Sequence, residues 1–465
     1  MVSLTQKNAF DLFYWSLFVL CLVCKVYFEP IKMYSFKTGG KAVTERWTAK
    51  KAHRWYNNRQ WIVGANFVPS SAESPVEMWN GATFDQQTID RELGFAASTG
   101  MNTVRVFLHY LLYINDKQNF LTRLETFLIL ADKRGMKTVF VFFDDCWDPE
   151  PKLDSKKQVR RHVHNWLWVQ CPGTQMLSNY PAVNVLLKDY VQTIASRYKD
   201  DRRILFWDLY NEPGNRNLGH YNESYTKISN SYRLLSKSFQ WIREIRITQP
   251  VTSALYLNDD FWNLQEIFKL QGLNSDFLTF HNYGDLENFS FWYRTMSVHG
   301  RPLVCTEYMA RSVNSTIKSI LPFARHHNVG MINWGLVSGK TQTIYPWDSW
   351  WKTYLHPPQI WFHDLFHANG TPFDQHELDI IANLSAAFSF ISGCAQSGKE
   401  KDGYSAFQRR YVLFPQPLDR RLKRLQHLQK NRAIEELLIE MHRLTGHPLL
   451  QTLLSDLAEE NLLLQ

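Results

Sequence analysis

The feature that most constrains the fold is an alternation of short apolar segments with helical stretches from Gln60 onward. Most of the apolar segments are nearly continuous runs, as expected for parallel strands that are buried on both faces. Eight segments are predicted to be strands, over residues 61–68, 102–109, 137–144, 203–210, 250–256, 276–283, 302–308 and 330–337. Eight strands alternating with helices predict an α/β fold, a closed (β/α)8 TIM barrel. An open doubly wound sheet is the alternative, but no glycine-rich turn follows the first segment.

Helices are predicted between the strands, over residues 84–99, 121–134, 181–198, 224–248 and 316–327. Gly100 and Gly135 stand just past the first two, where the left-handed backbone that glycine tolerates ends a helix. One connection, residues 146–179, is too long for a bare turn. Because long loops after barrel strands form the active face, we interpret it as a wall of a substrate cleft.

The barrel pattern does not cover the whole chain of 465 residues. We predict a signal peptide or signal anchor over residues 1–30, an N-terminal lead-in over 31–59, the barrel over 60–391 and a helical tail over 392–465. In the tail, apolar residues recur at steps of three and four, as on one face of a helix. They are Ile434, Leu437, Met441 and Leu444.

The N-terminal segment contains thirteen residues, 12–24, of which only Ser16 is polar, between Lys7 and Lys25. This length suits a signal-peptide core and is short for a membrane span of about 20 residues. If Lys25 snorkels, residues 12–28 form a membrane tether; an apolar helix packed on the domain is the alternative. We expect a secreted or membrane-anchored glycoprotein of the secretory pathway. Asn-x-Ser/Thr sequons stand at Asn222, Asn288, Asn314, Asn369 and Asn383.

Charge and cysteine content exclude some partners. The net charge of +8 is partly local to residues 418–430, and no zinc finger, RNA-recognition motif or arginine tract accompanies it. We therefore expect no nucleic-acid partner. The six cysteines lack zinc-site spacing. Cys146 and Cys171 flank one long segment and are expected to be able to form a disulfide if the chain is secreted.

Polar residues stand where the predicted strands end, which is where the chemistry of a (β/α)8 barrel lies. Glu212, in Asn211-Glu212-Pro213, follows the fourth strand, and Glu307 ends the seventh. Cleavage of a glycosidic bond needs two such carboxyl groups, one to protonate the leaving oxygen and one to attack or to activate water. For a retaining reaction they should lie about 5 to 5.5 Å apart. A buried ion pair with Arg105 is the structural alternative.

With these motifs, residues 60–387 resemble the clan A glycoside hydrolases, especially glycoside hydrolase family 5, the cellulase and mannanase family. The resemblance implies Glu212 as acid/base and Glu307 as nucleophile. It also matches Arg105, Asn211, His281 with Tyr283, and Trp334 to the family's substrate site. Residues 143–149 and 168–173 resemble a branch of bacterial proteins often labelled endo-xylanases, a label from which we infer no substrate. The family usually has a histidine at the end of strand three; this chain has Asp144 and Asp145, and His109 or His164 is expected to fill that space.

The expected roles follow from physical chemistry. Arg105 should lower the pKa of Glu307, and Tyr283 should donate to the same carboxylate. The surroundings of Glu212 should raise its pKa. Asn211 should bind the sugar 2-hydroxyl, and Trp334 should stack under the ring. Asp145 and Trp168 are further predicted substrate contacts. Loop aromatics expected in the cleft are Trp166, Trp168, Trp347, Trp350 and Trp351, with Asp348 among them.

The sequence therefore predicts a retaining glycoside hydrolase that acts on β-linked oligo- or polysaccharides through a covalent glycosyl-enzyme. His363, His367 and His376 show no metal-ligand spacing with a carboxylate, so no metal is expected, and no cofactor is expected either. The alternatives are a non-catalytic glycan-binding barrel, which the two intact glutamates disfavour, and a membrane-tethered scaffold that binds partners through its tail. The sequence alone decides neither the sugar nor endo against exo action.

Overall fold

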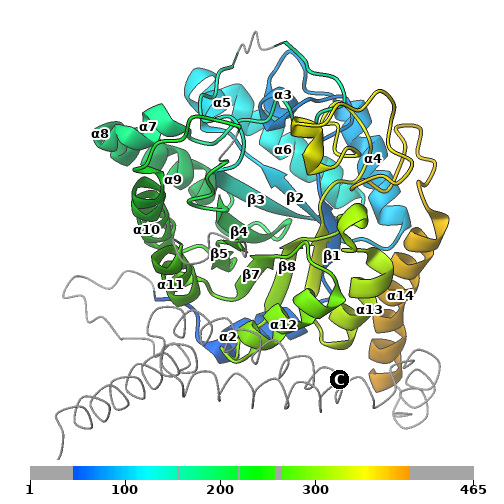
Figure 1. Cartoon of the computed structure of the whole chain (residues 1–465). Coiled ribbons are helices and arrows are strands. Elements are labelled where there is room, and N and C mark those ends of the chain that lie inside the picture. Colours follow the sequence, from blue (N-terminus) through cyan, green and yellow to red (C-terminus); the bar gives the residue numbers. More distant parts are fainter. Residues whose placement is uncertain (1–44, 154–157, 218–219, 257–263, 397–465) are drawn as a thin grey trace, which may run out of the picture. The chain divides into compact units, whose positions relative to one another are not determined.

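The structure, a computed structural model, describes residues 45–396 except 154–157, 218–219 and 257–263 (Figure 1). The chain divides into two compact units, residues 1–388 and 389–465. The predicted signal segment, most of the lead-in and nearly all of the tail lie outside the described residues, so these predictions stay predictions. Among the described helices, none combines the length and the apolar character needed to cross a membrane.

The strands form one sheet in which every pair of neighbours is parallel. Its order is β5-β4-β3-β2-β1-β9-β8-β7-β6. Their bounds are β1 Val63–Asn66, β2 Thr103–Phe107, β3 Lys137–Asp144, β4 Ile204–Asn211, β5 Val251–Thr252, β6 Leu255–Tyr256, β7 Leu278–His281, β8 Leu303–Glu307 and β9 Gly330–Asn333. Each lies within or one residue beyond a predicted segment, and helices surround them in Figure 1.

The ring closes through the fifth predicted strand, which is broken into β5 and β6. Thr252 in β5 pairs with Asp208 of β4, whereas Tyr256 in β6 pairs with His281 of β7. Because β5 and β6 are consecutive pieces of one segment, the sheet is a closed eight-stranded barrel and not an open doubly wound sheet. The α/β TIM-barrel prediction is confirmed.

Helices alternate with the strands as predicted (Figure 1). Their bounds are α2 Ala49–Asn57, α3 Pro75–Trp79, α4 Gln86–Ser98, α5 Tyr110–Asn115, α6 Lys117–Lys133, α7 Thr174–Ser178, α8 Tyr180–Ala182, α9 Lys188–Arg197, α10 Lys227–Ile245, α11 Gln265–Asn274, α12 Leu286–Ser297, α13 Ile317–His326 and α14 Gln375–Gln396. Short turns of other helical types are Val183–Leu187, Arg311–Val313 and Trp347–Trp350. The glycines predicted to end α4 and α6 have positive φ, 82° at Gly100 and 72° at Gly135.

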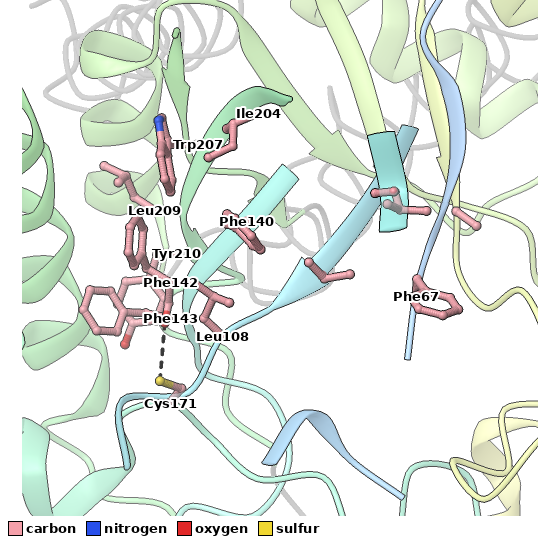
Figure 2. Packing of buried hydrophobic residues seen from close by; sticks show 14 of the residues in the cluster. Phe67, Leu108, Phe140, Phe142, Phe143, Cys171, Ile204, Trp207, Leu209 and Tyr210 are labelled. Atoms are coloured by element: carbon pink, nitrogen blue, oxygen red, sulfur yellow. Dashed lines mark hydrogen bonds between the residues drawn. The ribbon is translucent and has the colours of Figure 1, made fainter. Parts of the chain in front are cut away.

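The core fills both the barrel and the layer between strands and helices. Figure 2 shows aromatic side chains of β3 and β4 packed together; the rings of Phe142 and Trp207 stack at 5.3 Å. At the N-terminal ends of the strands, Trp55 of α2 packs against Phe277 at 5.0 Å and closes the barrel floor. The high aromatic content therefore serves the core as well as the opposite, open face.

Candidate active site

The C-terminal ends of four strands bring ionisable side chains together, because parallel strands of a barrel end on the same face. Arg105 comes from β2, Glu212 follows β4, His281 ends β7 and Glu307 ends β8. Glu212, His281 and Glu307 line a cavity of about 540 Å³ on that face. All four side chains are buried.

Glu212 is held by three groups. His281 Nδ1 lies 2.6 Å from its Oε1, while Asn215 Nδ2 and Cys146 Sγ donate to its Oε2 over 2.7 Å and 3.1 Å. The backbone of Glu212 has a positive φ of 45°. This left-handed conformation is costly for a residue with a side chain and is typical of functional sites, where the surroundings enforce it.

Glu307 has a different set of partners. Arg105 Nη1 donates to its Oε1 over 2.9 Å, and the hydroxyl of Tyr283 donates to its Oε2 over 2.9 Å. Arg105 also donates to Asp208, Asn66 and Asn211 at distances of 2.6–3.0 Å, so its guanidinium is fixed on all sides. The predicted contacts of Arg105 and Tyr283 with Glu307 are both present.

The two carboxylates approach each other closely. One carboxylate oxygen of each glutamate and one ring nitrogen of His281 all lie within 4.8 Å of one another. Of the residues the structure describes, these three form the one group of metal-ligand type that is this compact. His281 Nδ1 is 2.6 Å from Glu212 and 3.4 Å from Glu307 and so stands between the two carboxyl groups.

Burial dominates the protonation of this cluster. It raises the pKa of Glu212 to about 7, against which the donors Cys146 and Asn215 act. It also raises the pKa of Glu307 to about 7, although His281 and Arg105 act to lower it. The expected direct effect of Arg105 is therefore present but smaller than desolvation. The charge on Glu212 also acts to raise the pKa of Glu307, but of the two glutamates only Glu307 accepts from a cation and a phenol.

His281 is the neutral member of the cluster. Burial lowers its pKa to about 4, with the charge on Glu307 opposing that shift. A neutral imidazole can donate or accept at Nδ1 depending on its tautomer. It can therefore follow the protonation state of Glu212, to which that nitrogen is bonded.

Asn211 and Asp144 hold the floor beside Glu212. Asn211 Oδ1 accepts from Arg105 Nη2 over 2.6 Å, and its Nδ2 donates to Asp144 Oδ1 over 2.9 Å. Burial raises the pKa of Asp144 to about 7. Of the two histidines expected to replace the family's strand-three histidine, His164 lines the cavity, whereas His109 is buried against the Gln170 carbonyl and does not.

Aromatic side chains form the walls of the cavity. Trp334, Trp347, Trp350 and Trp351 line it, as predicted. Trp166 is absent from the lining, and Asp348 bonds Tyr354 over 2.7 Å instead of facing the cavity. Trp168 is also absent from it: this buried ring packs against Trp334 at 5.3 Å and Phe107 at 5.4 Å and so supports Trp334 from behind. The structure thus does not give Trp168 its predicted substrate contact.

Asp145 is a second correction, since it is fully buried and does not line the cavity. Its carboxylate accepts from the hydroxyls of Tyr210 and Ser231 and from the backbone N–H of Gly214, over 2.5–2.6 Å. These bonds tie the end of β3 to the loop that carries Glu212. Asp145 therefore positions the site instead of binding sugar. The adjacent residues Asp144 and Asp145 look alike in the sequence, so the sequence does not predict that the side chain of Asp145 points into the protein.

The predicted disulfide is wrong, because Cys146 and Cys171 are both free thiols. Cys171 donates to the Phe142 carbonyl, the dashed line in Figure 2, and Cys146 donates to Glu212. Sequence reasoning missed several cavity residues: Cys146, Trp147, Asn215 and His220. Asn215 had a usable signal, since it stands three residues after Glu212 on the same loop.

Comparison with known proteins assigns this fold and site to a class. The model of the Cellulase (glycosyl hydrolase family 5) family matches residues 64–339. The chain belongs to glycosyl hydrolase family 5. It is therefore a glycoside hydrolase, in a clan A family of retaining glycosidases. A comparison with curated proteins found no match.

Solved structures share the fold at low sequence identity. A GH5_18 protein from Streptomyces cattleya, solved in complex with GlcNAc, has 13% identity and a TM-score of 0.51 over 71% of this chain and 81% of that one. An exo-β-1,4-mannosidase from Opitutaceae bacterium strain TAV5 has 17% identity and a TM-score of 0.47, over 70% and 60%. An endo-β-1,4-mannanase from Thermotoga petrophila has 15% identity and a TM-score of 0.46, over 72% and 78%. At these identities the likeness to the first structure concerns the fold alone.

Proposed function

We propose that this chain hydrolyses β-linked glycans with retention of configuration, with Glu307 as nucleophile and Glu212 as acid/base. The observation that carries the proposal is the close approach of the two carboxylates, with one oxygen of each within 4.8 Å. Retaining glycosidases place these groups about 5 to 5.5 Å apart, whereas inverting enzymes need about 6.5 to 9.5 Å to admit a water.

The first step would use the different surroundings of the two glutamates. Glu307, ionised beside Arg105, attacks the anomeric carbon, and Glu212 gives its proton to the leaving oxygen. The glycosyl–oxygen bond to the leaving group breaks as the ester to Glu307 forms. Tyr283 donates to the Glu307 oxygen that does not face Arg105, so it helps to orient the carboxylate for attack.

The second step reverses the role of Glu212. Esterification removes the negative charge of Glu307, and a carboxylate loses a like charge that disfavours its ionisation when such a close neighbour becomes neutral. Glu212 is then the stronger acid, is present as carboxylate, and takes a proton from the incoming water. Asn211, held by Arg105 and Asp144, is placed to bind the sugar 2-hydroxyl, and Trp334 supplies the platform under the ring.

Two variants test these roles. Glu307→Ala should abolish turnover, and azide should restore it with inverted product because a small anion occupies the vacated space. Glu212→Ala should still be glycosylated by an aryl glycoside with a good leaving group, giving a burst and then slow turnover, and azide should yield product of retained configuration. The product anomer is assigned by NMR. The same anomer from both variants with azide would reject the assignment, and full activity in both would favour the non-catalytic alternative.

We also propose that residues 12–28 direct the chain into the secretory pathway and remain attached as a tether. The apolar run of residues 12–24 between lysines supports this proposal, as do the five sequons. N-terminal sequencing of the purified protein and its electrophoretic mobility before and after deglycosylation test it. An unglycosylated, full-length cytosolic protein would contradict it.

A further inference from the structure

We infer that residues 158–170 of the loop after β3 close the glycone end of the cavity, so that the enzyme removes single sugars from the non-reducing ends of its substrate. This inference rests on the proposed function and adds its mode of action. Three observations carry it: the direction in which a glycan must cross the barrel, the bonding of the loop, and the space left behind Trp334.

The direction follows from the sheet order. The two carboxylates must flank the anomeric carbon, so the glycan passes between β4, which precedes Glu212, and β8, which carries Glu307. A line from β4 to β8 divides the barrel mouth into two sides. The first side holds β3, β2, β1 and β9, and the second side holds β5, β6 and β7. Trp334 follows β9, so the glycone ring that stacks on it lies on the first side and the leaving group lies on the second.

The cavity does not extend across the first side. Its lining comes from the ends of β3, β4 and β6–β9 and the loops after them, and no residue of the loops after β1 and β2 takes part. On the leaving-group side, by contrast, the lining includes Asn217, Tyr256, Asn282 and Asn288. The cavity thus has room for the leaving group but ends on the glycone side.

The barrier on that side is a segment we call the β3 wall, residues 158–170. It is hydrogen-bonded along its length to the loop after β9. Gln342 accepts from the His162 N–H and donates to the carbonyls of Arg160 and Val163 at 3.0 Å. The Asn165 N–H donates to the Thr341 carbonyl over 2.9 Å.

His164 lies at the centre of the β3 wall. Its N–H donates to Ser349 Oγ over 3.0 Å, its carbonyl accepts from Trp350 Nε1 over 2.9 Å, and its Nδ1 lies 2.8 Å from the Tyr345 carbonyl. On the cavity side its ring packs beside Trp147, which stacks on Trp350 at 6.0 Å. A segment tied at so many points is a fixed wall and not a mobile loop.

The space beyond Trp334 is already filled. There, Trp168 of the β3 wall packs against both Trp334 and Phe107, and those two rings also contact each other at 5.8 Å. The hollow bounded by Trp168, Trp334, Asn66–Val68 and Asp364 has a volume of about 20 Å³. A volume of this size holds little more than one water molecule. A second sugar cannot follow the first past Trp334, so only the terminal residue of a glycan can occupy the glycone position.

Product analysis on the wild-type enzyme tests the inference. Tetrasaccharides of the β-1,4-mannan, cellulose and xylan types, fluorescently labelled at the reducing end, are digested and resolved by electrophoresis over time. The first labelled product should be the trisaccharide. Mannan- and cellulose-type tetrasaccharides whose terminal sugar is capped as a 4,6-ketal should resist cleavage.

The outcomes separate the two proposals. A labelled disaccharide or monosaccharide as first product, or cleavage of the capped substrates, would overturn exo action but leave the hydrolase proposal standing. No turnover of these substrates or of any aryl β-glycoside would reject the proposed function and this inference with it.

A wall variant provides the second measurement. Trp168→Ala should open the space behind Trp334, and cleavage of the capped substrate should rise at least about tenfold from the wild-type background, for a variant whose thermal unfolding remains cooperative. Val159→Ala is the matched control, because this half-exposed side chain lies on the same segment but does not line the cavity. If a folded Trp168→Ala enzyme releases terminal sugars but still leaves capped substrate intact, the β3 wall is not the barrier.

Discussion

Glu212 and Glu307 are buried to the same degree, but different groups donate to them. Glu307 accepts from a guanidinium and a phenol, and Glu212 accepts from an amide and a thiol. A charged donor stabilises a carboxylate more than neutral donors do. The different hydrogen-bond donors of the two glutamates therefore support the different roles proposed for them, Glu307 as nucleophile and Glu212 as acid/base.

The thiol of Cys146 makes a testable contribution. Its hydrogen bond acts to lower the pKa of Glu212, so Cys146→Ala should raise that pKa. If the protonated form of Glu212 is the active one, the alkaline limb of the kcat/KM profile should move upward. A hydrogen bond worth about 1 kcal/mol corresponds to roughly 0.7 pH unit.

The control is Cys171→Ala, which removes a buried thiol that bonds a backbone carbonyl and no carboxylate. Its pH profile should match the wild type. An unchanged or downward-shifted alkaline limb in a folded Cys146→Ala enzyme would show that the thiol does not tune Glu212.

At the scale of elements, the fifth strand departs from the prediction of one continuous segment. Side chains replace ladder bonds at the break: Ser253 Oγ donates to the Tyr210 carbonyl over 2.8 Å, and Gln271 Nε2 donates to the Ala254 carbonyl over 2.5 Å. The apolar pattern of residues 250–256 does not predict the break, because the side chain that bonds Ala254 there, Gln271, lies 17 residues further along the chain.

This break should make the seam between β4 and β7 the least protected part of the barrel. Short ladders open at a lower free-energy cost than long ones, so backbone amides of residues 252–256 should exchange with deuterium faster than those within β3 and β4. Hydrogen exchange with mass spectrometry checks this, with peptides from β2 as an internal reference. Equal protection in the seam and in β3 would contradict it.

The sequence predicted strands and helices well because burial on both faces and glycine stops are local signals. It also predicted that Glu212, Glu307, Arg105, His281 and Tyr283 lie together on one face, and the structure brings them together there because strand ends fix their location. It failed where orientation decides: Asp145 turns inward to Ser231, Trp168 turns behind Trp334, and Cys146 and Cys171 bond oxygen atoms instead of each other. These choices depend on neighbours from distant segments, which no local pattern encodes.

For the whole molecule, the site is a source of instability at neutral pH. The folded-state pKa of Glu212, about 7, exceeds its ordinary value of 4.5. The folded state therefore holds a proton that the unfolded chain releases, and stability falls as pH rises from about 4.5 to about 7. Glu212→Gln removes this loss, so its melting temperature should exceed that of the wild type by a margin that grows over that range.

Thermal unfolding at pH 4, 5.5 and 7 measures the margin. Glu287→Gln, an exposed substitution on α12, is the control for removing a carboxyl group that lies outside the site. A Glu212→Gln margin that is constant across pH, or largest at pH 4, would contradict the raised pKa.

The β3 wall also determines the route by which substrates enter the cavity and products leave it. With the glycone end closed, substrate enters and product departs on the side of the cavity that Asn217, Tyr256 and Asn288 line, which is its opening among the described residues. Once the leaving group has gone, the sugar held on Glu307 faces that opening, and the next molecule to arrive there is its acceptor. In dilute solution the acceptor is water, and the glycosyl-enzyme is hydrolysed. In concentrated saccharide the hydroxyl group of another sugar is the acceptor, so the enzyme should also lengthen glycan chains by transglycosylation.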